Sequence, residues 1–199
     1  MAIKPILFNT EMVRAILDGR KTCTRRLPRS NIETKYYEYD EWVRAVAPPG
    51  STYLREKEFY EQYPLYQPGD TLYVRETWMD YAGRTMYRAD CDKYRLESLK
   101  LAEFSWEPSI HMPKEAARIW LKVTDVRVER LQDITIEGIR KEGLEPRFNV
   151  KDKFSDGIAR GRFLELWNST IKKSDLDRYG WDANPWVWVI EFERCEKPE

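Results

Sequence analysis

Polarity along the first 27 residues predicts three short elements. Ile6, Leu7 and Phe8 form a short apolar run that fits a strand, and Asn9 or Thr10 can cap the helix that follows. The apolar positions of this helix form one stripe at helical spacing, made of Met12, Val13, Ile16 and Leu17. Gly19 stands where a helix C-terminal glycine belongs. Residues 21–27 are then predicted to be extended, with their charged side chains placed just after a helix end.

The pattern breaks between Pro28 and Gln67, where tyrosine, glutamate and arginine are frequent and no period is sustained. We interpret residues 28–67 as an insertion that contains one short helix around residues 39–46. Pro68-Gly69-Asp70 predicts a turn, and residues 71–78 alternate as a strand does. Glu76 falls on the apolar face of this strand. A carboxylate in that position is costly unless it is paired, so we expect Glu76 to meet an arginine or a ligand.

The second half of the chain predicts further strands and two helices. A short strand is expected at residues 87–89, and the longest strand pattern covers residues 117–131. Its apolar positions change parity near Thr124 and Asp125, which predicts a bulge or a bend there. Residues 133–142 are predicted to form a helix that ends at Gly143. A polar, mobile loop is expected at 147–161, an amphipathic helix at 163–171 and a final strand at 186–192.

These elements together predict an α+β fold. Mostly antiparallel strands with a few helices between them favour a small β-barrel with flanking helices and the insertion described above. A chain of 199 residues suits a single domain, here residues 1–199.

Composition excludes several classes of protein. The 34 basic and 34 acidic side chains cancel, which argues against a protein that coats nucleic acid through bulk charge. The cysteines Cys23, Cys91 and Cys195 have no metal-ligand spacing, and His111 is the one histidine, so we expect no metal and no cofactor. Residues 1–20 are charged and no long apolar run follows, so we expect a cytoplasmic protein without a membrane segment.

The segment that carries the most chemistry is Gly19-Arg20-Lys21-Thr22-Cys23-Thr24-Arg25-Arg26, hereafter the octet. It resembles the signature of ASCH domains, in which a glycine and a lysine are followed by an arginine at the position of Arg26. The resemblance to a phage- and prophage-encoded branch of that family extends over stretches from both halves of the chain, namely residues 4–8, 68–70, 74–78, 108–113, 127–134 and 181–186. It does not cover the insertion at 28–67.

The resemblance implies a PUA-like barrel that binds RNA or a modified nucleoside. Some small ASCH members are similar to amidohydrolases that remove the acetyl group from acetylated cytidine, using a lysine, a threonine and a helical glutamate. By motif position these correspond to Lys21, Thr24 and Glu142. Arg26 and Arg25 are the expected phosphate or carboxylate ligands, and Glu76 and His111 are expected to line the cleft.

Several alternatives remain open. Lys21 could act as the base that activates Thr24, or it could stay charged and stabilise an oxyanion while Glu142 carries the proton. The arginines could instead be salt-bridged, His111 could make a structural hydrogen bond, and the tryptophans near the C-terminus could belong to the core rather than stack on a base. A phage accessory protein that uses the insertion at 28–67 to contact a protein partner is a further possibility. So is a ribonuclease, although a single histidine excludes a two-histidine mechanism.

Overall fold

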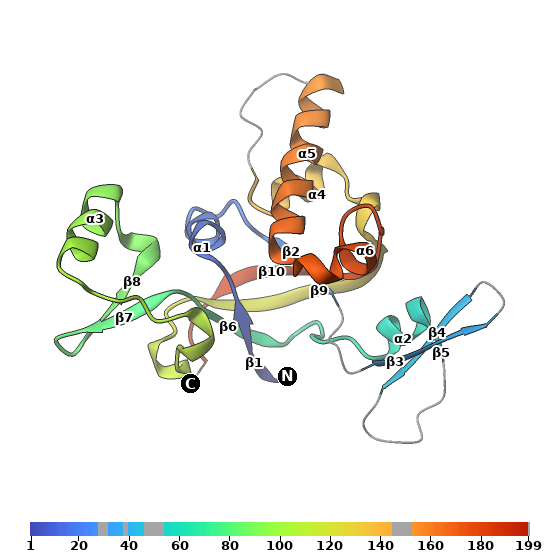
Figure 1. Cartoon of the computed structure of the whole chain (residues 1–199). Helices are drawn as coiled ribbons and strands as arrows, with labels where there is room; N and C mark the ends of the chain where they lie inside the picture. The colour runs from blue at the N-terminus through green and yellow to red at the C-terminus, as the bar shows by residue number, and fades with distance from the viewer. Residues whose placement is uncertain (28–31, 38–39, 46–53, 145–152, 199) are drawn as a thin grey trace. The chain divides into compact units, whose positions relative to one another are not determined.

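The computed structural model describes residues 1–27, 32–37, 40–45, 54–144 and 153–198 (Figure 1). The chain divides into two compact units. The first unit consists of Met1–Thr22, Pro68–Thr124 and Phe192–Glu199, and the second of Cys23–Gln67 and Asp125–Glu191. Two long strands, β9 (Trp120–Arg130) and β10 (Trp186–Cys195), contribute residues to both units. The expected single domain stays a prediction.

In the first unit, strand β1 (Ile3–Leu7) pairs in parallel with β6 (Thr71–Arg75), and β6 pairs antiparallel with β9. Helix α1 (Thr10–Leu17) begins as predicted, because the Asn9 side chain accepts a hydrogen bond from the Met12 N–H at 2.8 Å. It ends at a glycine cap: Gly19 has φ +74°, and the N–H groups of Gly19 and Arg20 donate to the carbonyls of Ile16 and Ala15.

The rest of the first unit is made of short elements. Strands β7 (Trp78–Tyr81) and β8 (Arg84–Tyr87) form a hairpin, followed by helix α3 (Lys93–Leu101). The strand predicted for residues 87–89 is right only at Tyr87, because residues 88–90 form a 3-10 turn that the Cys91 N–H closes on the Arg88 carbonyl. The described residues of this unit also form the 3-10 turns η1 (Arg88–Asp90), η2 (Ser109–His111) and η3 (Lys114–Ala116).

In the second unit, strand β2 (Cys23–Arg26) pairs antiparallel with β10. Helices α4 (Ile136–Lys141) and α5 (Lys153–Thr170) pack on one face of these strands (Figure 1), where Cys23, Val187 and Val189 share a core with Ile139 and Phe163. Turn η4 (Leu131–Asp133) precedes α4, so the helix predicted from residue 133 begins later, at an N-cap formed by Thr135. Turn η5 (Lys173–Asp175) and helix α6 (Leu176–Tyr179) follow α5.

The helix predicted within the insertion is wrong. Strand β4 (Asp40–Ala45) occupies that place, between β3 (Ile32–Tyr37) and β5 (Leu54–Arg55) in an antiparallel three-stranded sheet. Aromatic and β-branched residues such as Trp42 and Val43 favour a strand when a partner strand is present. Residues 39 and 46 lie outside the described part. The helix of the insertion is α2 (Glu56–Gln62), further along the chain.

The prediction of a loop at residues 147–161 is wrong from residue 153 onwards. Residues 153–161 belong to α5, which therefore starts ten residues before the helix predicted from residue 163. Burial explains the extension, because Ala159 is 5% exposed and continues the apolar face that Phe163 begins. Residues 147–152 lie outside the described part. In β9, Thr124 and Asp125 are both exposed where the parity of the strand was predicted to change, and the bulge itself stays a prediction.

The fold is mixed α+β, as predicted. The largest sheet has five strands in the order β1-β6-β9-β10-β2. Within the described residues no strand pairing joins β1 to β2, and the β1–β6 pair is parallel, so a closed antiparallel barrel is not found there. None of the helices in the described ranges has the length and apolar character needed to span a lipid bilayer.

Candidate functional site

Strand β2 carries the octet residues Thr24, Arg25 and Arg26 at the edge of the five-stranded sheet. Residues that face each other on paired strands project to the same side of a sheet. Arg25 is opposite Val189 and therefore lies on the face that α4 and α5 cover, hereafter the helix face. Thr24 and Arg26 are opposite Ile190 and Trp188, on the other face. The octet side chains on β2 therefore lie on both faces of the sheet rather than on one.

On the helix face, Arg25 bridges two carboxylates. Its Nη1 lies 3.3 Å from Glu142 Oε1 and its Nη2 lies 3.3 Å from Glu129 Oε2. The side chains of Arg25 and Glu142 are only 2% and 4% exposed, so both charges are removed from water and depend on each other. Arg25 Nε is buried without a hydrogen-bond partner in the described part of the chain. Of the two expected roles of Arg25, the geometry thus shows the salt-bridged one.

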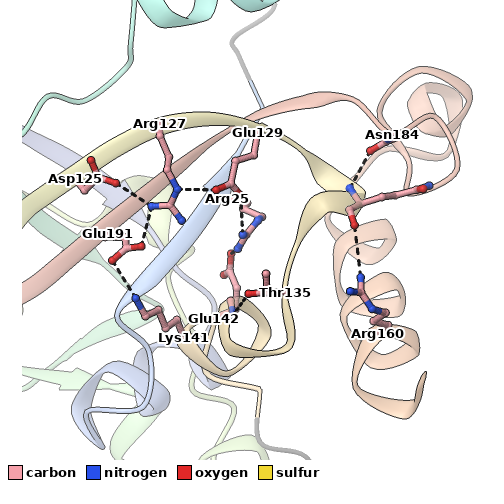
Figure 2. A network of polar contacts seen from close by, with 12 residues as sticks. Arg25, Asp125, Arg127, Glu129, Thr135, Lys141, Glu142, Arg160, Asn184 and Glu191 are labelled. Carbon is pink, nitrogen blue, oxygen red and sulfur yellow. Dashed lines mark hydrogen bonds and ion pairs between the residues drawn. The ribbon is translucent and has the colours of Figure 1, made fainter. Parts of the chain in front are cut away.

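A network of charged residues continues from this bridge, as Figure 2 shows. Arg127 binds Glu129 at 2.6 Å, Asp125 at 2.8 Å and Glu191 at 2.8 Å, and Lys141 binds Glu191 at 3.2 Å. These bonds lower the pKa of the Glu191 carboxyl, overcoming burial, which alone would raise it. The network borders a hollow of about 120 Å³ next to Arg25.

The arginines around this hollow are neutralised by carboxylates. The charged residues that line it are Arg25, Arg127, Lys141, Glu129, Asp133, Glu137 and Glu191, so anions outnumber cations. A hollow with this balance does not favour a phosphate group. The helix face therefore holds Glu142 in place and is poorly suited to bind an anionic ligand.

Thr24 and Arg26 occupy the opposite face of β2. Thr24 is 1% exposed and Arg26 is half-buried. Burial lowers the pKa of the Arg26 guanidinium, while the nearby Glu142 and Tyr66 act in the opposite direction. Glu142 is the C-cap of α4, directly before Gly143 with φ +88°. The structure thus brings Glu142 close to two arginines of the octet, Arg25 and Arg26.

Lys21 belongs to the first unit, just before the chain enters the second. It is 2% exposed, and its Nζ lies 5.5 Å from the centroid of the Phe8 ring. Lysine is almost never buried to this degree unless its charge is compensated. The expected convergence of Lys21 with Thr24 and Glu142 stays a prediction.

Glu76 is buried and has the arginine partner that its place on an apolar face requires. Arg118 donates from Nε to Glu76 Oε1 at 2.9 Å and from Nη2 to Oε2 at 3.1 Å, a two-pronged geometry that suits a carboxylate. Arg118 also binds Asp90 at 2.6 Å and lies over the Tyr87 ring. Burial raises the pKa of Glu76, and Arg118 opposes that shift. A role for Glu76 as a ligand contact stays a prediction.

His111 lies at the end of turn η2, and its side chain is exposed. Its imidazole makes no hydrogen bond or ion pair within the residues the structure describes, so the expected structural hydrogen bond is not found there. Arg75 holds the same loop by donating to the carbonyls of Ile110 and Met112.

Sequence reasoning missed the residues that surround Arg25. Asp125, Arg127 and Glu129 alternate with Val126 and Val128, and this period of two indicates a strand with one charged face. That signal was available, whereas the pairing with Glu191 depends on two strands meeting in space. Among the described residues no group of histidine, cysteine, aspartate and glutamate side chains has the arrangement of a metal site.

Comparison with known proteins leaves the family unassigned. No family model matches the chain, and no curated protein matches it either. Among solved structures, an ASCH domain from Lactobacillus crispatus JV V101 is similar over 97% of this chain and 79% of that chain, with a TM-score of 0.39 and 10% identity. That likeness is too distant to assign a shared family or a shared activity.

Proposed function

We propose that this chain is an ASCH-type protein of PUA-like fold that binds RNA or a modified nucleoside, with Lys21, Thr24 and Arg26 at the ligand. Lys21, Thr24 and Arg26 are the octet residues for which the resemblance to ASCH domains implies a role at the ligand. The observation that carries the proposal is their burial, since Lys21 is 2% and Thr24 1% exposed within a segment that also contains Arg20, Arg25 and Arg26. A basic segment that merely covered the surface would leave its lysine in water.

Glu142 supports the same proposal. A glutamate at a helix end is ordinarily exposed, yet this one is 5% exposed, and two arginines of the octet interact with it. Because a buried carboxylate is costly, its place next to the octet favours a role there. Arg25 would then act on the ligand through Glu142, as a positioning residue.

The enzymatic form of this proposal is hydrolysis of an acylated nucleoside such as acetylated cytidine. The Thr24 hydroxyl attacks the acyl carbon and gives its proton to Lys21 or Glu142, and the amide C–N bond breaks as the nucleoside amine gains a proton. Water then hydrolyses the threonine ester, which releases acetate and restores the hydroxyl. If Lys21 stays charged, it stabilises the oxyanion instead.

Isothermal titration with acetylated cytidine, cytidine and a short single-stranded RNA tests the binding proposal. We expect binding of at least one of them to wild type and its loss in the Lys21→Ala/Arg26→Ala double variant. The matched control is Lys172→Ala, an exposed lysine of the second unit, which should bind as wild type does. Unchanged affinity in a folded double variant would falsify the site.

Acetate release from acetylated cytidine tests the enzymatic form separately. Thr24→Val keeps the shape of the side chain and deletes the hydroxyl, so turnover should fall to the level of buffer while binding persists. Turnover that survives Thr24→Val excludes threonine as the nucleophile. Absence of turnover in wild type removes the enzymatic form and leaves the binding proposal to the titration.

A further inference from the structure

Two cations gather around the ring of Trp186, on the face of the second unit opposite α4 and α5. Arg130 Cζ lies 4.2 Å from the centroid of the Trp186 ring, and Lys57 Nζ lies 5.6 Å from the same centroid. Arg130 comes from the end of β9, Trp186 from the start of β10 and Lys57 from α2. These three residues are hereafter the Trp186 cluster.

Backbone contacts hold Arg130 in this position. Its Nη1 donates to the Asn184 carbonyl at 3.1 Å, and the Asn184 side chain accepts from the Gln132 N–H at 2.8 Å. Asn184 itself takes the left-handed conformation, with φ +47°, and the Leu131 N–H donates to the Pro185 carbonyl at 3.0 Å. The segments on both sides of Arg130 and Trp186 are thus tied together, so little side-chain entropy remains to be lost when Arg130 binds a ligand.

The positive charge of the Trp186 cluster is only partly matched by carboxylates. Buried or half-buried arginines elsewhere in the chain, such as Arg25, Arg118 and Arg127, bind carboxylates directly. Arg130 makes no ion pair in the described part of the chain. Lys57 has one partner, Glu61, at 3.6 Å, and both of these side chains are about half exposed. An indole ring attracts cations without neutralising them, so this cluster favours an anion.

The cluster lies beside the proposed nucleoside site. Trp188 is opposite Arg26, and Trp186 lies two residues earlier in β10, about 7 Å away, on the same face of the sheet. The Trp188 indole donates to the Tyr60 carbonyl at 2.9 Å, which fixes α2 and therefore Lys57 against this face. A nucleoside held at Thr24 and Arg26 would bring an attached phosphate within reach of Arg130.

We infer that Arg130 and Lys57 form a phosphate subsite, and that the ligand is a nucleotide or an RNA rather than a free nucleoside. This inference rests on the proposed function, since it extends the same site. The phosphate could belong to a mononucleotide or to an RNA strand. The two share the chemistry that the guanidinium recognises, and affinity for each separates them.

The test compares the affinities of cytidine, cytidine 5′-monophosphate and a five-nucleotide single-stranded RNA for wild type, Arg130→Gln and Lys57→Gln. A phosphate should raise the affinity of wild type at least about tenfold over cytidine. Arg130→Gln should abolish this increment and leave cytidine binding unchanged. For the RNA, the slope of log K against log salt should become shallower by about 0.7 for each phosphate that the variant no longer neutralises. A merely structural role of Arg130 would not change that slope.

Controls keep the outcomes distinct. Arg140→Gln removes an exposed arginine of the same unit and should retain the full increment. Lys57→Gln alters an exposed side chain and should reduce the increment even if Arg130→Gln is poorly folded. The subsite is overturned if the gain in affinity that the phosphate gives over cytidine survives both variants. It is also overturned if wild type shows no such gain. Phosphate-dependent binding that is lost in Arg130→Gln, without any binding of cytidine, supports the subsite and counts against the nucleoside site instead.

Discussion

The Arg25 guanidinium lies 3.3 Å from the Glu142 carboxylate, although the two residues are 117 positions apart in the chain. Both side chains are almost fully buried, and Glu129 completes the bridge on the other side of Arg25 (Figure 2). A buried pair of this kind adds little net stability compared with apolar residues of the same size, but removing one member leaves the other charge uncompensated. The contact therefore fixes where the end of α4 lies relative to β2.

Loss of the Arg25 charge should strongly destabilise the protein. In Arg25→Met, Glu142 and Glu129 lose a shared cation, and the free energy of unfolding should fall by about 3–5 kcal/mol. Urea unfolding followed by tryptophan fluorescence measures this change. The matched control is Arg140→Gln, whose partner Glu137 is exposed, and it should change stability by no more than about 0.5 kcal/mol. Equal effects of the two substitutions would mean that the buried bridge has no special role.

Two glycine substitutions should change the stability of the protein in opposite directions. A Cβ at Gly138 in α4 would lie 3.2 Å from Ile134 Cγ1 and 3.3 Å from Arg25 Nη2, so Gly138→Ala should push on the bridge and destabilise the protein. A Cβ at Gly157 in α5 would meet nothing within 4 Å. Gly157→Ala should therefore stabilise by about 0.5–1 kcal/mol, the usual gain for alanine in a helix. Thermal unfolding distinguishes the two, and stabilisation by Gly138→Ala would contradict the tight contact with Arg25.

The Glu191 carboxylate should make the protein sensitive to acid. Its pKa in the folded state is lowered from the ordinary 4.5 by Arg127 and Lys141, against the opposing effect of burial. The unfolded chain therefore binds the proton more readily, and the stabilisation is present above pH 4.5 and lost as the pH falls through the lower folded pKa. Glu191→Gln should reduce stability at pH 7 and make the loss of stability below pH 4.5 shallower.

Urea unfolding of wild type and Glu191→Gln across that pH range measures this difference. Glu193→Gln, an exposed carboxylate two residues further along β10, serves as the control and should follow wild type. Parallel pH profiles for wild type and Glu191→Gln would show that the contacts with Arg127 and Lys141 do not shift the proton affinity of this group.

Local features could be predicted from the sequence, and long-range pairings could not. Helix α1 was predicted because its cap, its apolar stripe and Gly19 all lie within a dozen residues. Strand β4 was mistaken for a helix because its identity depends on pairing with β3, for example Val43 with Thr34. A short segment with mixed propensity takes the structure that its partner imposes.

The same division applies to the candidate site. Lys21 and Thr24 could be named from the octet and its resemblance to the ASCH signature, and Glu142 from the similarity of residues 134–144 to the helix that carries the glutamate in small ASCH members. The place of Glu76 on an apolar face predicted that it needs a partner. The identity of that partner could not be predicted, because Arg118 is 42 residues away in the chain. The positions of Arg25 and Arg26 on opposite faces of β2 follow from the period of two of a strand, whereas which face α4 and α5 cover became clear only from the packing of Cys23 and Val189.

Methyl NMR of threonine-labelled protein tests the central claim most directly, because it shows where a ligand binds without altering the site. The Thr24 signal is assigned by its disappearance in Thr24→Val, and acetylated cytidine or a short RNA is then titrated into wild type. The account predicts that Thr24, which is 1% exposed, shows the largest shift, while the exposed Thr85 of β8 does not move. A ligand that binds and shifts other threonines while leaving Thr24 unchanged would contradict it.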